Sequence, residues 1–68
     1  MNAPIVPDSV ILQLELTDDQ ALALAQFCKR LSWSEFRHNA VNESEAYTIR
    51  TAVTLLREEL AYKGFAPR

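Results

Sequence analysis

The clearest pattern of apolar and polar positions lies near the end of the chain, in residues 42–63. The apolar residues recur three and four positions apart, which is the spacing of one face of an α-helix. Asn42 and Glu45 have the spacing of a capping box, and Gly64 suits the left-handed position that ends a helix, with Phe65 packing back on it. The pattern predicts a long helix with a core-facing stripe made of Ala46, Ile49, Val53, Leu56 and Leu60.

The apolar surface of this predicted helix is wider than one neighbouring helix covers. Ala52, Leu55 and Tyr62 extend it around the cylinder to roughly half of the circumference. Either two neighbours within the chain or a second chain would cover such a surface, and the sequence leaves both open. The opposite side is polar and predicts a surface that contacts a partner, made of Tyr47, Arg50, Thr54 and Arg57.

Residues 9–16 alternate with a period of two. Valine or leucine occupies every second position, and the positions between hold Ile11, Gln13 and Glu15. This period is typical of a half-buried β-strand, which needs a partner for its backbone groups. The partner would be either residues 3–6, folded back, or the same strand of a second subunit. The second arrangement predicts a homodimer with an interface made of Val10, Leu12, Leu14, Leu55 and Tyr62.

A second helix is predicted over residues 18–31. Thr17 and Gln20 have the spacing of a capping box before its first turn. Its apolar residues go nearly all the way round the helix, which predicts burial on more than one side.

A short helix is predicted over residues 33–40, because Ser32 and Glu35 give a further capping-box spacing. Trp33 and Phe36 are expected to face the core. The predicted fold class is therefore mainly α, with one N-terminal β-strand followed by a small bundle of two long helices and one short helix.

The length of 68 residues allows one small domain. Residues 1–8 contain two prolines and are expected as an extended N-terminal arm, followed by a single domain over residues 9–68. No apolar run approaches the ~20 residues of a membrane span, and the N-terminus lacks the regions of a secretion signal. We therefore expect a cytoplasmic protein.

The charge balance disfavours nucleic acid as the main partner. Seven Lys and Arg residues against nine Asp and Glu residues give a net charge of −2. Proteins held on nucleic acid by counterion release are usually basic, although a local basic patch can oppose the net charge.

The sequence predicts no catalytic residue, metal site or cofactor. Cys28 and His38 are the single Cys and the single His, and they form the one nucleophile and base pair available. Cys28 has apolar neighbours, among which a small buried side chain is its usual role. One His and one Cys do not make a zinc spacing, and Gly64 is the single glycine, which leaves no glycine-rich phosphate loop.

The order strand, helix, helix resembles the ribbon-helix-helix family of dimeric DNA-binding repressors and antitoxins. The matching pieces are VILQLEL, TDDQALALAQFCKRL and SEAYTIRTAVTLLREEL. The resemblance implies that two strands pair across a dimer axis and that outward side chains enter the major groove. On this alternative, the DNA-binding residues would be Ile11, Gln13 and Glu15. The family joins its helices by a short turn, whereas residues 32–41 are inserted here.

The stretches LELTDDQALALAQFCKRLSWSEF, EAYTIR and the ending GFAPR also resemble a family of short uncharacterised bacterial and phage proteins. That resemblance implies no activity. Short acidic proteins of phages and mobile elements include anti-CRISPR inhibitors, which occupy a surface of a host complex. We therefore expect a non-enzymatic interaction protein that occupies the surface of a partner protein, of which an anti-CRISPR-like inhibitor is one kind. The alternative is a ribbon-helix-helix-like regulator or antitoxin that binds DNA as a dimer.

Overall fold

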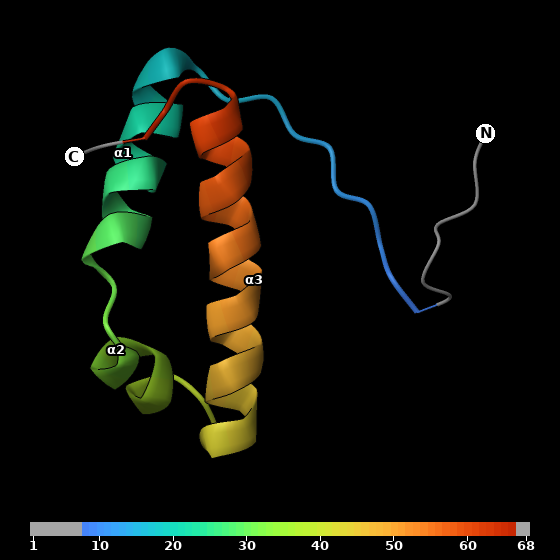
Figure 1. Ribbon diagram of the computed structural model, residues 1–68, viewed down its shortest axis with the longest axis vertical. Helices are drawn as coiled ribbons and strands as arrows, with labels where there is room; N and C mark the ends of the chain where they lie inside the picture. The colour runs from blue at the N-terminus through green and yellow to red at the C-terminus, as the bar shows by residue number, and fades with distance from the viewer. Residues whose placement is uncertain (1–7, 67–68) are drawn as a thin grey trace.

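The computed structural model describes residues 8–66, and these form three helices. α1 (Asp18–Arg30) and α3 (Glu43–Tyr62) run antiparallel, side by side, while the short α2 (Trp33–His38) lies beyond the end of α1 and packs on the first half of α3 (Figure 1). The fold is thus a helical hairpin in which one side is broken into α1 and α2. Each boundary agrees with the sequence prediction to within two residues.

Side-chain hydrogen bonds between the residue before the helix and the third helical residue define the starts of α1 and α2. The Thr17 hydroxyl accepts a hydrogen bond from the backbone N–H of Gln20 at 3.1 Å, and the Gln20 side chain accepts one from the Thr17 N–H at 2.9 Å. At α2, the Glu35 carboxylate accepts from the Ser32 N–H at 2.7 Å and from the Ser32 hydroxyl at 2.5 Å. Both capping boxes were predicted from the spacing, and both are confirmed.

The start of α3 differs from the prediction by one residue. The Asn42 side chain accepts from the Glu45 N–H at 2.9 Å, as expected of a cap. The Glu45 carboxylate accepts from the N–H of Val41 at 2.8 Å instead of from that of Asn42. The second half of the predicted box therefore holds the connecting turn against the helix.

The end of α3 is a Schellman motif. Gly64 has a φ of 100°, its N–H donates to the carbonyl oxygen of Ala61 at 3.0 Å, and the N–H of Phe65 donates to that of Leu60 at 2.8 Å. Phe65 also packs on the cluster that contains Leu60, as predicted. This turn directs the chain back over the space between α1 and α3.

Small side chains form the contact between α1 and α3. Ala21, Ala25 and Leu60 are buried together at the N-terminal end of α1. Alanine at two successive turns lets the two helices approach closely, so that leucine from α3 fills the space. Four half-buried side chains close this cluster, and they are Leu16, Leu24, Leu56 and Phe65.

A second contact packs α2 on α3. Phe36 is buried, and Ala46 on α3 is fully buried at 0 % exposure. Ile49 and Val53 are half-buried on the same face of α3. The predicted core-facing stripe of α3 is therefore confirmed, and so is the core position of Phe36.

The predicted N-terminal β-strand is wrong. Residues 8–17 form neither a strand nor a helix. In Figure 1 this segment passes the end of α3 and then runs away from the three helices. A strand is stable only when another strand pairs with its backbone groups, and residues 8–66 of the single chain offer none. The alternative mate, residues 3–6, lies outside the described residues. The same finding removes the ribbon that would carry Ile11, Gln13 and Glu15 in the ribbon-helix-helix alternative; DNA binding itself stays a prediction.

The expectation that α1 is buried on more than one side is also wrong for the single chain. Leu22 is 44 % exposed and Phe27 is 56 % exposed, whereas Ala21, Ala25 and Cys28 are the buried residues of this helix. A hairpin places one neighbour beside α1, so its remaining apolar side chains meet solvent. In the described part of the chain, no helix is both long and apolar enough to cross a lipid bilayer.

Candidate functional site

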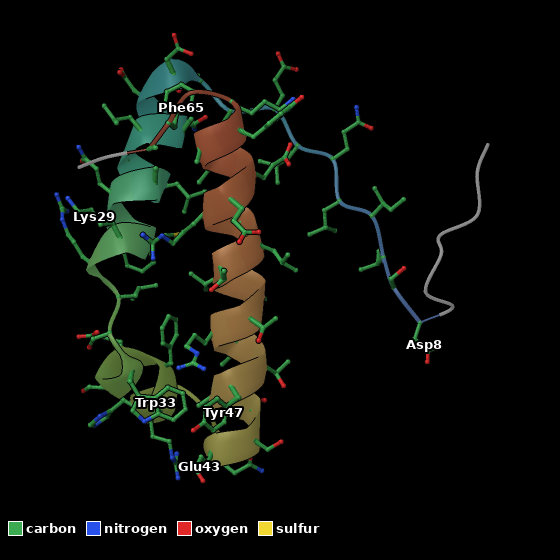
Figure 2. All side chains as sticks on the ribbon, viewed as in Figure 1. Asp8, Lys29, Trp33, Glu43, Tyr47 and Phe65 are labelled. Carbon is green, nitrogen blue, oxygen red and sulfur yellow. The ribbon has the colours of Figure 1, made fainter. Side chains whose placement is uncertain are left out.

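Two aromatic rings from different helices meet at the α2 end of the hairpin. Trp33 is the first residue of α2, and Tyr47 lies in the second turn of α3. Their ring centroids are 4.6 Å apart with an interplanar angle of 40°. Figure 2 labels both side chains, which lie next to each other between the two helices. α2 packs on α3, with Phe36 buried on one helix and Ala46 buried on the other, and this packing brings the two rings together.

Arg50 completes the cluster. Its guanidinium carbon lies 5.1 Å from the centroid of the Tyr47 ring and 5.5 Å from that of the Trp33 ring. A cation at this distance is attracted by the electron-rich faces of both rings, and each such contact is worth about 0.5–1 kcal/mol at an exposed site. We call Trp33, Tyr47 and Arg50 the aromatic–arginine cluster.

The cluster is accessible and its charge is not neutralised by a neighbour. Tyr47 is 48 % exposed, Arg50 is exposed and Trp33 is half-buried. Within residues 8–66 no carboxylate forms an ion pair with Arg50, and the ion pair found there joins Lys63 to Glu59 at 4.0 Å. The guanidinium is therefore held in place by two rings while its positive charge stays available to an external anion.

Thr54 and Arg57, the other two residues of the predicted partner-binding surface, lie further along the same flank of α3. The Thr54 hydroxyl donates to the backbone carbonyl of Arg50 at 2.9 Å. Both residues line an open hollow of ≈ 320 Å³ between α1 and α3, together with Ala25, Glu58, Ala61, Phe65 and Ala66. The structure therefore divides the four predicted residues into two groups, Tyr47 and Arg50 in the cluster and Thr54 and Arg57 at the hollow.

Sequence reasoning missed the role of Trp33. It was expected in the core, but it is only half-buried, and it joins the two predicted residues Tyr47 and Arg50. Fourteen positions separate Trp33 from Tyr47, so no helical spacing relates them. The contact follows from the turn between α2 and α3, and the sequence signals the ends of that turn but not its direction.

A second hollow, which sequence reasoning also missed, opens where all three helices meet. It has a volume of ≈ 260 Å³. Its lining is made of Phe27, Leu31, Glu35, Phe36, Asn39, Ile49 and Val53. We call it the apolar hollow because five of these seven side chains are hydrocarbon. The nearly all-round apolar pattern of residues 18–31 was the available signal, since it includes Phe27 and Leu31.

Cys28 has the environment of a structural thiol. It is 2 % exposed, and burial raises its pKa, while the positive charge of Arg57 offsets part of the rise. A raised pKa keeps the sulfur protonated near neutral pH, whereas a nucleophile must be a thiolate. In the described chain no hydrogen bond joins Cys28 to His38, which lies at the exposed end of α2. Residues 8–66 also contain no group of three potential metal ligands.

The residues predicted to form a dimer interface are all exposed. Val10, Leu12 and Leu14 lie on the N-terminal segment with exposed fractions of 78, 78 and 62 %. Leu55 and Tyr62 are 63 and 83 % exposed on the side of α3 that faces away from the buried stripe. Residues 11, 13 and 15, of the DNA-binding alternative, are exposed as well. Their roles in binding stay predictions.

A known protein family matches the whole chain. Residues 1–68 match DUF7706, which is described as a family of unknown function. The chain belongs to this family. No curated protein and no solved structure matches it. Membership in DUF7706 confirms the predicted resemblance in its coarse form, a family without an assigned activity, while the bacterial or phage source and the ribbon-helix-helix resemblance stay predictions.

Proposed function

We propose that this chain is a non-enzymatic interaction protein that acts by occupying an acidic surface of a partner protein. The observation that carries the proposal is the aromatic–arginine cluster, in which one cation lies over an exposed tyrosine ring and a half-buried tryptophan ring. Trp, Tyr and Arg are the residues most enriched at the energetic centres of protein interfaces. The core lies on the buried stripe of α3, and none of the three cluster residues belongs to the buried core cluster.

The chemistry of the cluster favours a carboxylate of the partner. A guanidinium presents its N–H groups in a planar fork that matches the two oxygens of Asp or Glu. Stacking on Trp33 and Tyr47 restricts the Arg50 side chain, so less conformational freedom is lost when an anion binds. Arg57, two turns further along the same flank, adds a second positive charge. An acidic partner surface thus fits the proposal better than a purely apolar one.

Surface occupancy is also how an anti-defence inhibitor of the anti-CRISPR kind works, so inhibition of a partner complex is one form of the proposed function. In that form, binding itself blocks the partner, and no reaction on this chain is required. The buried and protonated Cys28 is compatible with such a mechanism, because the chain then needs no nucleophile.

Site-specific photo-crosslinking in the cells that naturally produce the protein tests the proposal. A photoreactive phenylalanine analogue replaces Tyr47 in one variant and Tyr62 in the matched control, since Tyr62 is an exposed tyrosine at the other end of α3. We expect a defined protein adduct from position 47 that disappears on adding Arg50→Glu and persists on adding Lys63→Glu. If charge reversal at both Arg50 and Arg57 leaves every adduct unchanged, this surface is not the binding site.

A further inference from the structure

The N-terminal segment combines apolar side chains with a fixed exit from the body. Leu16 packs on the core, and the three hydrogen bonds at Thr17 fix the backbone where it leaves α1. Beyond that point, residues 8–15 run out past α3 and away from the helices (Figure 1). We call residues 8–15 the arm from here on, as distinct from the extended segment expected over residues 1–8. Four of its side chains are 62–78 % exposed: Val10, Ile11, Leu12 and Leu14. Nothing in the described chain covers them.

The apolar hollow is the concave counterpart of such side chains. It is lined by hydrocarbon from α1, α2 and α3, and Phe27 at its side is 56 % exposed. A volume of ≈ 260 Å³ accommodates about two aliphatic side chains, given that a cavity of roughly 150 Å³ accommodates one benzene. By helical spacing, Leu24 lies one turn from Phe27, and Leu56 one turn from Val53, so the apolar surface continues from the hollow toward Leu16.

The exposed area of the chain is larger than that of a compact monomer of the same mass. The chain exposes 6015 Å². A compact monomer of 7.7 kDa exposes ~4,300 Å², so the excess is roughly 1,700 Å². Each partner of a standard interface contributes about 800 Å². The excess is larger than this contribution, and the exposed apolar side chains of the arm and Phe27 are surfaces that a second copy would bury.

We propose that two copies of this chain form a dimer by exchanging arms, with Leu12 and Leu14 of each copy seated in the apolar hollow of the other. Each copy then supplies one arm and one hollow, so the contact closes on itself under two-fold symmetry instead of continuing into a chain of subunits. The exchange covers the arm and Phe27 at once. The contact is made by side chains in the apolar hollow, and it involves no strand pairing.

Two features favour the second copy over the chain's own arm, and a third favours the hollow as the receiving surface. The hydrogen bonds at Thr17 direct the arm outward. The hollow lies toward the opposite end of α1, roughly 15–20 Å from the point where the arm leaves, so folding back would require a sharp reversal beside Leu16. Leu55 and Tyr62 are less suited as a receiving surface, because they are single exposed side chains on a convex face that also carries Glu59.

Disulfide trapping in the full-length chain tests the register. In a Cys28→Ala background, Gln13→Cys places a thiol between Leu12 and Leu14, and Asn39→Cys places one in the lining of the hollow without removing an apolar side chain. The two single variants carry tags of different size and are mixed before oxidation. We expect a cross-link between unlike chains. Glu58→Cys, which lines the other hollow, is the matched control and should give none with Gln13→Cys.

Molar mass by light scattering over a range of concentrations tests the association itself. The wild type is expected at twice the mass of one chain, and Leu14→Asp is expected at the mass of one chain. Leu55→Asp is the control, because Leu55 and Leu14 are equally exposed at 63 and 62 %, and it should leave the dimer intact. Helical circular dichroism equal to the wild type shows that each variant is folded.

Three results would overturn the proposal. The first is a wild type of single-chain mass at every concentration. The second is a cross-link within a chain that carries both Gln13→Cys and Asn39→Cys, together with none between the mixed single variants, which assigns the hollow to the chain's own arm. The third is dissociation by Leu55→Asp but not by Leu14→Asp. None of them bears on the aromatic–arginine cluster, which lies on the other flank of α3, so the proposed function is tested separately.

Discussion

The backbone N–H of Phe65 donates to the carbonyl oxygen of Leu60 at 2.8 Å, and the Phe65 ring packs on the cluster that contains the Leu60 side chain. One turn therefore ends α3 and also closes the core between α1 and α3. The turn depends on Gly64, whose φ of 100° is a conformation that other residues rarely adopt.

We expect Gly64→Ala to lower the free energy of unfolding by about 1–2 kcal/mol, the strain of an L-residue in a left-handed conformation. An added Cβ would meet nothing within 4 Å, so the loss would be conformational and not a clash. For a chain of this size, each kcal/mol corresponds to a shift of about 4–8 °C in Tm, which circular dichroism measures. Gly64→Asn should lose less, since Asn tolerates this region. An unchanged Tm for Gly64→Ala would mean that the turn does not stabilise the fold.

The contact between Trp33 and Tyr47 should stabilise the docking of α2 as well as shape the surface. In a double-mutant cycle of Trp33→Ala and Tyr47→Ala, we expect a coupling free energy of about 0.5–1.5 kcal/mol. Urea unfolding followed by circular dichroism gives the four values. The cycle of Trp33→Ala with Tyr62→Ala is the control and should be additive, because Tyr62 lies at the other end of α3. Equal coupling in both cycles would contradict the ring contact.

Glu35, at the start of α2, makes the stability of the fold depend on pH. The Ser32 hydroxyl, and then the Ser32 backbone N–H, donate to the Glu35 carboxylate and lower its pKa from the usual 4.5. A lowered pKa in the folded state means that the ionised form stabilises the fold above pH 4.5 and that this contribution is lost as the pH falls through the folded pKa.

Glu35→Gln should therefore be less stable than the wild type at neutral pH, and the difference should shrink as the pH falls below 4.5. Unfolding curves at several pH values measure the difference. Ser32→Ala removes the hydroxyl that is the main donor to the Glu35 carboxylate. In that background, the loss of stability caused by Glu35→Gln should be smaller. A difference between wild type and Glu35→Gln that is constant across the acid range would show that this carboxylate does not titrate with folding.

Cys28 should react slowly in the folded chain, because its thiol is 2 % exposed and its pKa is raised by burial. Labelling by a disulfide reagent near neutral pH then requires the contact between α1 and α3 to open, so we expect a rate well below that in denaturant. Gly64→Ala, which loosens that contact, should speed the labelling. Equal rates with and without denaturant would mean that the thiol is accessible in the native state.

The sequence predicted the helices well because the signals that begin and end them are local. The caps at Thr17, Ser32 and Asn42 and the stop at Gly64 each depend on residues within a few positions of one another. The period-two pattern before Thr17 is also local, but a strand depends on a remote mate, and the pattern does not say whether one exists. Tyr47 and Arg50 were placed on a polar face by helical spacing alone, whereas the arrival of Trp33 beside them depends on tertiary structure.

Leu16 marks where the fold ends and the arm begins. It is half-buried on the core cluster, while Leu14, two positions earlier, is 62 % exposed. At concentrations low enough to keep chains apart, Leu16→Ala should destabilise the chain by about 1–2 kcal/mol, less than the 2–5 kcal/mol of a fully buried leucine. Leu14→Ala should have no effect there, because its side chain already meets solvent.

At higher protein concentration, Leu14→Ala should become less stable than the wild type. If arms are exchanged, the wild type gains stability with concentration and Leu14→Ala gains less, while the loss caused by Leu16→Ala stays constant. Thermal unfolding at a series of concentrations measures both effects. A Leu14→Ala variant that matches the wild type at every concentration would show that Leu14 contributes to no contact between chains, and equal stability of Leu16→Ala and wild type would place the boundary of the fold after Leu16.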